Sequence, residues 1–145
     1  AERWNALKIS PKPIRFNPVY VVQLKRQPPQ VGLLEPFLAG AYVKHNDNAG
    51  GVFTPVERRE RETPQAFSHF TFVATEGRRL VCDIQGVGDV YTDPQIHTDP
   101  HDAFPVPGNN GLAGMRDFFL THRCNPLCFA FLKKLDEEKA TSPLK

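Results

Sequence analysis

Prolines limit the length of every regular element in this chain. The sequence holds 14 of them among 145 residues, and each proline removes a backbone N–H donor and fixes φ. Neither change is tolerated in a helix interior or a central strand, so we expect short elements joined by ordered loops. With 40% hydrophobic and 23% charged residues, the composition is typical of a single globular domain rather than a disordered segment.

The hydrophobic pattern predicts a mixture of helices and strands. Helical structure is expected at 1–7, 63–73, 112–122 and from 125 to about 131, and strands at 14–24 and 79–84. A second apolar run at 31–38 is broken by Pro36 and is expected to end at a sheet edge or a linker. Residues 90–111 carry four prolines and little periodicity, which is typical of a functional or disordered loop. The charged run 57–62 is expected to form a solvated face, and the polar tail after Lys133 is expected to fray.

A histidine and two cysteines near the C-terminus have the spacing of a soft-metal site. His122, Cys124 and Cys128 offer one imidazole and two thiolates within seven residues. Zinc takes four such ligands in a tetrahedron. Cys128 is expected in the first turn of a helix, where the positive helix end favours a thiolate. The alternative interpretation is two buried cysteines and a core histidine.

A fourth zinc ligand must come from elsewhere in the sequence. His69 is the best candidate because it lies on the apolar face of the predicted helix 63–73, and His97 and His101 in the long loop are the alternatives. Four protein ligands leave no open position, so such a site is structural rather than catalytic. The third cysteine, Cys82, is interpreted as a small core residue of a strand.

Three oxygen-bearing side chains form a candidate hard-cation site. Asp83 and Gln85 follow a buried-looking strand with period-two spacing and therefore point to one side, and Asp93 lies in a turn fixed by Pro94. Magnesium takes one or two protein oxygens together with phosphate and water oxygens. Phosphoryl transfer also needs a carboxylate near the attacking hydroxyl. The alternative interpretation is a pair of turn-capping aspartates.

Bulk properties exclude some classes of function and favour others. A net charge of +2 is low for a nucleic-acid-binding protein. Three cysteines are an odd count that does not suit a secreted disulfide framework, so we expect a cytoplasmic, intracellular protein. The sequence also shows no apolar run of about 18 residues that could cross a membrane, and no signal-peptide pattern.

Taken together, these segments resemble the alpha-kinases, a family of atypical protein kinases. The resemblance is carried by 35–38, Gly40-x-Tyr42-x-Lys44, 65–71, the strand ending at Asp83, 91–97 and the His122/Cys124/Cys128 group. It implies an α+β, protein-kinase-like fold and an ATP-dependent protein kinase that phosphorylates serine or threonine on a protein substrate. The motifs of conventional protein kinases are absent from the sequence.

The resemblance also implies a role for each candidate residue. Asp83 falls on the catalytic aspartate, and Gln85 and Asp93 fall on the magnesium ligands. The structural zinc ligands fall on His69, His122, Cys124 and Cys128, the adenine-binding linker on Glu35, Pro36, Phe37 and Leu38, and the glycine-rich loop near Gly108 and Gly111. The residue pattern alone favours a helix-entry loop for the 108–111 segment over the alternative, a backbone site for an anion.

Two departures from the family pattern affect these expectations. Val106 stands where the first glycine of the loop is expected. The chain also begins near the end of the first lobe's helix, so the strands with the nucleotide-phosphate lysine are expected before Ala1. We therefore expect a partial alpha-kinase domain at 1–133, with 1–38 as the end of the N-lobe and linker, 39–133 as a zinc-containing C-lobe, and 134–145 as a flexible tail. The rival function is a catalytically inactive pseudokinase or zinc-stabilised interaction module.

Overall fold

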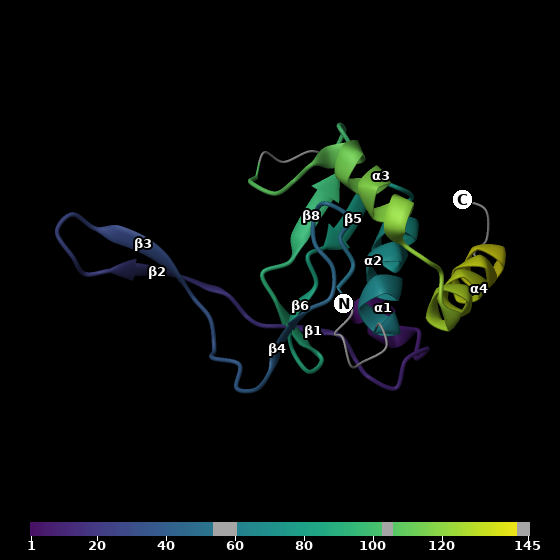
Figure 1. Ribbon diagram of the computed structural model, residues 1–145, viewed down its shortest axis with the longest axis horizontal. Helices are drawn as coiled ribbons and strands as arrows, with labels where there is room; N and C mark the ends of the chain where they lie inside the picture. The colour runs from purple at the N-terminus through teal and green to yellow at the C-terminus, as the bar shows by residue number, and fades with distance from the viewer. Residues whose placement is uncertain (54–60, 103–105, 142–145) are drawn as a thin grey trace.

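The computed structural model describes residues 1–53, 61–102 and 106–141, in which short strands alternate with helices (Figure 1). In chain order the elements are α1 (Glu2–Ala6), β1 (Arg15–Phe16), β2 (Tyr20–Leu24), β3 (Gln30–Leu34), β4 (Tyr42–Lys44), α2 (Glu62–Ala74), β5 (Arg79–Cys82), β6 (Gln85–Val87), β7 (Val90–Thr92), β8 (Gln95–Thr98), α3 (Gly111–Thr121) and α4 (Pro126–Thr141). No helix in these ranges is long and apolar enough to cross a membrane.

The largest sheet of the described chain has the strand order β1-β7-β6-β4. β7 runs parallel to β1 and antiparallel to β6, and β6 runs antiparallel to β4. A separate antiparallel pair joins β5 to β8. Its ladder ends at Cys82↔Gln95 and the β6–β7 ladder begins at Gln85↔Thr92. The two links between these ladders, 83–84 and 93–94, therefore face each other at a bend in one long hairpin.

Most of the core lies between α1, α2, α4 and the four-stranded sheet. Trp4 of α1 contacts Phe67 and Phe70 of α2 edge to face, with ring centroids 5.9 and 5.3 Å apart, and Phe131 of α4 packs against the same group. Such aromatic pairs contribute roughly 0.5–1.5 kcal/mol beyond their buried area. A smaller cluster, which includes Cys82, packs β5 against α3.

The hairpin of β2 and β3 projects away from this core (Figure 1). Its two strands pair only with each other in the described chain, and the apolar side chains of Val21, Val31 and Leu33 are largely exposed. A two-stranded hairpin without a packed face has little independent stability in water.

The structure corrects three sequence expectations. The strand predicted at 14–24 is split into β1 and β2 around Asn17-Pro18, because proline cannot donate to the ladder. The loop predicted at 90–111 contains β7 and β8, which have three and four residues and are too short for an alternating pattern to reveal them. The tail is helical through Thr141, since Leu135 packs in the core. Most of the charged run, at 57–60, lies outside the described residues.

Candidate functional site

Asp83 occupies the bend between β5 and β6. Its φ of 57° lies in the left-handed region, where a residue with a side chain is uncommon and often marks a functional position. The side chain is 13% exposed, so the carboxylate is largely withdrawn from solvent.

Lys44 of β4 forms an ion pair with this carboxylate. In the β4–β6 ladder Lys44 lies opposite Gln85. The backbone of Lys44 is therefore next to a residue only two positions after Asp83. Its Nζ lies 2.6 Å from Asp83 Oδ1, and the hydrogen bond to Asp83 raises the pKa of Lys44 above its usual value. The role of Lys44 was not evident from the sequence, because nothing local to β4 indicates which residue will face it.

Gln85 and Asp93 join the same site. Gln85 Nε2 donates to Asp83 Oδ2 at 3.2 Å and lies 3.5 Å from the backbone oxygen of Asp93. Asp93 is exposed and has a φ of 47° in the facing bend. The structure thus brings together Asp83, Gln85 and Asp93, as expected from sequence. An amide oxygen and an exposed carboxylate are ligand types that suit magnesium, which completes its octahedron with water and phosphate oxygens.

Glu35, the first residue of the segment 35–38, connects this segment to the site by hydrogen bonds. Glu35 Oε2 accepts hydrogen bonds from Thr92 Oγ1, next to Asp93, and from Asn17 Nδ2 at 3.1 Å. Asn17 Nδ2 also donates to the backbone oxygen of Pro36 at 2.9 Å. Phe37 is 92% exposed and Leu38 is half-buried, so neither side chain is drawn into the site. The role of Asn17 in holding this segment was not evident from the sequence.

The turn from Gly108 to Gly111 packs beside β8 and leads into α3. Asn48 Nδ2 donates to the Gly108 carbonyl oxygen at 3.2 Å. Gly108 has a φ of 88°, and a Cβ there would lie 2.1 Å from Gln95 Oε1, two residues after Asp93. The turn is therefore adjacent to the bend that carries Asp93, and the positive φ of Gly108 favours glycine there.

His97 lies beneath this turn rather than near the cysteines. Its Nε2–H donates to the Asn48 carbonyl oxygen at 3.0 Å, and its Nδ1 accepts from the Asn110 N–H at 3.1 Å. Burial lowers the pKa of His97, so the ring is neutral. His97 is thereby removed as an alternative zinc ligand, and His101 is exposed and outside the cluster.

Four predicted zinc ligands converge from α2, α4 and the link between α3 and α4, which begins at His122. The donor atoms of His69, His122, Cys124 and Cys128 all lie within 4.8 Å of one another. His122 Nε2 lies 3.1 Å from His69 Nδ1, 3.8 Å from Cys124 Sγ and 3.6 Å from Cys128 Sγ. Tetrahedral zinc with Zn–N near 2.0 Å and Zn–S near 2.3 Å separates its ligands by roughly 3.3–3.8 Å, so this donor set fits the ion.

Burial keeps His69, His122 and Cys128 uncharged when no cation balances them. It lowers the pKa of His122 to about 4 and that of His69 as well, so both imidazoles present a lone pair. Burial also raises the pKa of the Cys128 thiol to about 11. Without a cation, desolvation therefore outweighs the backbone hydrogen bond at Asn125 that favours the Cys128 thiolate. A cation would have to displace that proton.

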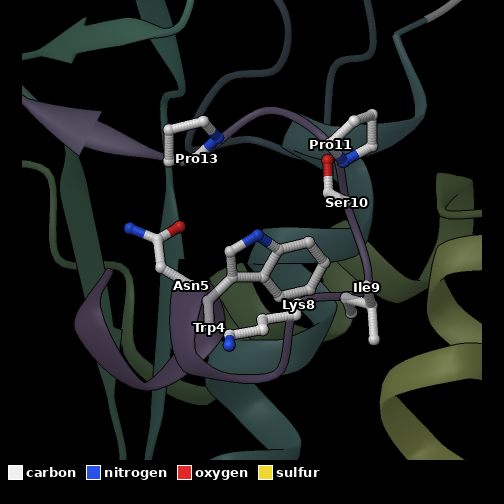
Figure 2. Close-up of a pocket in the computed structure, with 7 residues that line it drawn as sticks. All are labelled: Trp4, Asn5, Lys8, Ile9, Ser10, Pro11 and Pro13. Atoms are coloured by element: carbon white, nitrogen blue, oxygen red, sulfur yellow. The ribbon is translucent and has the colours of Figure 1, made fainter.

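A pocket of about 230 Å³ lies elsewhere, between α1 and the segment that follows it (Figure 2). Trp4, Asn5 and Lys8 line one side, and Ser10, Pro11 and Pro13 line the other. None of the candidate site residues lines this pocket.

The chain is similar to known proteins along most of its length. A model of the alpha-kinase family matches residues 1–128. The chain belongs to the alpha-kinase family. It is 46% identical over 142 residues to myosin heavy chain kinase C of Dictyostelium discoideum, covering 96% of this chain and 17% of that protein. It is 44% identical over 128 residues to human eukaryotic elongation factor 2 kinase, covering 88% of this chain and 17% of that protein.

Solved alpha-kinase domains share the fold. The alpha-kinase domain of myosin heavy chain kinase A in complex with ADP aligns with a TM-score of 0.79 and 45% identity, over 89% of this chain and 51% of that domain. A crystal structure of the same kinase domain with a phosphorylated aspartate aligns with a TM-score of 0.81. The expected α+β kinase-like fold is thus confirmed. This chain spans about half the length of those domains.

Proposed function

We propose that this chain provides the catalytic part of an ATP-dependent protein serine/threonine kinase of the alpha-kinase type. The observation that carries the proposal is the arrangement of Lys44, Asp83 and Gln85 beside Asp93. A lysine cation, the partly buried Asp83 carboxylate and two candidate oxygen ligands, from Gln85 and Asp93, meet there. The alpha-kinase relatives named above are protein kinases, and a related domain has been solved with ADP.

Each residue of the bend has a distinct proposed role. Asp83 accepts or orients the proton of the attacking serine or threonine hydroxyl, as a carboxylate does in phosphoryl transfer. Lys44 holds the Asp83 carboxylate in place and adds positive charge where phosphate oxygens would lie. Gln85 and Asp93 would hold magnesium, which neutralises charge on the transferred phosphate.

The nucleotide is proposed to lie between two backbone segments. Residues 35–38 would contact the adenine through backbone atoms, which agrees with the exposure of Phe37 and the anchoring of Glu35 by Thr92. The turn 108–111 would present backbone groups from Gly108 and Gly111 on the other side, at the start of α3.

The His69, His122, Cys124 and Cys128 cluster is proposed to bind a structural zinc ion. Its donors come from α2, the end of α3 and the start of α4, so four protein ligands would tie these helices together without an open position. Thiolate ligands persist best in a reducing compartment, which agrees with a cytoplasmic protein.

ATP binding and phosphate transfer by the folded chain test this proposal. Isothermal titration with ATP and Mg²⁺ should show micromolar binding, and radiolabelled ATP should label the chain itself or added myosin heavy chain or elongation factor 2. Asp93→Ala should abolish the magnesium-dependent part of both signals. Asp136→Asn, on the exposed surface of α4, is the matched control and should change neither. Absence of binding and of transfer would favour the inactive, zinc-stabilised module instead.

A further inference from the structure

Three consecutive residues at the end of β4 all act on the bend that holds Asp83. Lys44 pairs with the Asp83 carboxylate. The His45 N–H donates to the carbonyl oxygen of Ile84 at 2.8 Å, and Asn46 Oδ1 accepts from the Ile84 N–H, also at 2.8 Å. The side chain of Asp83 and the peptide group that follows it are therefore held from the same short segment.

The peptide between Asp83 and Ile84 needs such support. The left-handed φ of Asp83 is uncommon for a residue with a side chain, and it persists where the surroundings impose it. The orientation of the Ile84 N–H depends on ψ of Asp83. A hydrogen bond from that N–H to a fixed acceptor therefore sets the backbone from which the Asp83 carboxylate projects.

Buried polar side chains on α2 fix the amide of Asn46. Its Nδ2 donates to Gln65 Oε1 at 3.2 Å and to Ser68 Oγ at 3.1 Å. Gln65 Nε2 donates to a backbone oxygen beside β4 at 2.9 Å, and the Ser68 hydroxyl donates to the Pro64 carbonyl at 3.2 Å. Asn46, Gln65 and Ser68 are all buried. Both donors of the Asn46 amide are thus satisfied by α2, so its oxygen must face Ile84.

We propose that Asn46 is a positioning residue for Asp83. Gln65 and Ser68 set the orientation of its amide, and its oxygen holds the Asp83–Ile84 peptide so that the carboxylate meets Lys44 and Gln85. The expected effect of Asn46 on phosphate transfer rests on the proposed kinase function. Its effect on the Asp83–Ile84 peptide does not. Ser68 precedes His69 in α2, so the candidate zinc cluster and the support of Asp83 share one helix.

Asn46→Ala tests the proposal against a matched control, Asn5→Ala. Asn5 brackets Ile14 in a comparable way, with Nδ2 donating to the Ile14 carbonyl at 2.8 Å and Oδ1 accepting the Ile14 N–H at 2.9 Å. It lies beside the pocket of Figure 2, remote in sequence and contacts from Asp83. Ser68→Ala is a milder variant that removes one partner of the Asn46 amide.

The expected result has a structural and a kinetic part. In Asn46→Ala, hydrogen exchange at the Ile84 amide should accelerate at least about tenfold, and kcat for phosphate transfer should fall at least about tenfold with KM for ATP within about twofold. Ser68→Ala should change the exchange rate at Ile84 and kcat in the same directions but by less. Asn5→Ala should lower the melting temperature without changing the exchange rate at Ile84 or kcat.

The proposal would be overturned if hydrogen exchange at the Ile84 amide were unchanged in Asn46→Ala. It would also be overturned if phosphate transfer fell only in proportion to the loss of folded protein, which the Asn5→Ala control measures. If Asn46→Ala does not fold, Ser68→Ala decides by the same two readouts. If the wild-type chain transfers no phosphate, the proposed function fails, and exchange at Ile84 alone decides whether Asn46 positions the bend.

Discussion

At the scale of single residues, the site depends on side chains that meet from different strands. The Lys44–Asp83 pair joins β4 to the bend after β5, and Gln85 reaches back to the other Asp83 oxygen. The carboxylate is therefore held at both oxygens and has little freedom to rotate. A fixed carboxylate suits a residue that must meet one hydroxyl in one geometry.

Lys44→Met should lower the rate of phosphate transfer about 10- to 100-fold, because it removes a positive charge beside the reacting groups. The lysine side chain is 39% exposed, so the melting temperature should change little. Steady-state kinetics at several ATP concentrations provide the measurement. Lys12→Met removes a more exposed lysine, which pairs loosely with Asp89 at 3.9 Å, and should leave kinetics unchanged. Equal rates in the two variants would contradict the assignment of Lys44.

His45 gives the folded chain a sensitivity to acid. Burial, and to a lesser degree the charge of Arg61, lowers the pKa of His45 to about 4, whereas an unfolded histidine titrates near 6.5. Between these values only the unfolded state gains the proton, so the free energy of unfolding falls as pH drops from about 6.5 to about 4. The contribution of this group is at most about 3 kcal/mol.

Denaturant unfolding of wild type and His45→Gln at pH 7 and pH 5 measures this contribution. The difference in stability between the two proteins should shrink at pH 5, because the variant lacks the titrating ring. A constant difference between the two pH values would show that His45 is not the group responsible.

At the scale of elements, α3 approaches β8 closely through a glycine. A Cβ on Gly114 would lie 2.5 Å from His97 Nε2, so the helix fits against the ring only without a side chain there. The same ring bonds Asn48 and the first turn of α3 through Asn110. The packing of α3 and the shape of the 108–111 turn are therefore linked.

Gly114→Ala should destabilise the fold by roughly 1–3 kcal/mol through overpacking against His97. Gly32→Ala in β3 is the matched control, since its added Cβ would meet only Val22 Cγ2 at 4.0 Å. Chemical denaturation of both variants gives the two free energies of unfolding. If the Gly114 variant is as stable as the Gly32 variant, α3 does not rest on His97 in this way.

At the scale of the whole molecule, helices from distant parts of the sequence meet at the His/Cys cluster. α2, α3 and α4 contribute to it directly or at their ends. α4 also packs on α2 and α1 through Phe131. A zinc ion there would stabilise the arrangement of all three helices, and its loss would lower the stability of the chain as a whole.

Cys124→Ser should lose the zinc that the wild-type chain is expected to carry at about one ion per chain, together with a large drop in melting temperature. Elemental analysis of the folded, dialysed protein measures the metal directly. Cys82→Ala is the control, because Cys82 is buried 3.4 Å from His97 and outside the cluster, so its zinc content should remain that of wild type. A folded wild-type chain without zinc would remove the structural role proposed for the cluster.

Local spacing in the sequence was enough to indicate the residues of the two candidate sites. His122, Cys124 and Cys128 lie within seven residues, and Asp83, Gln85 and Asp93 within eleven, so each group is visible as a short local pattern. The helices around 63–73 and 112–122 followed from apolar periodicity, because a 3.6-residue repeat is visible without knowledge of the partner surface.

Only the tertiary structure decided how these groups are held. Strand register brings Lys44 to Asp83 and places the two bends face to face, and the packing of α2 brings His69 to the cysteines and Ser68 to Asn46. Asn17 and Asn46 have no local pattern that distinguishes them from other polar residues, and the Gly40-x-Tyr42-x-Lys44 motif does not reveal which residue Lys44 pairs with. Their roles depend on contacts between segments 18 to 39 positions apart, and such contacts are set by pairing and packing rather than by the spacing of neighbours along the chain.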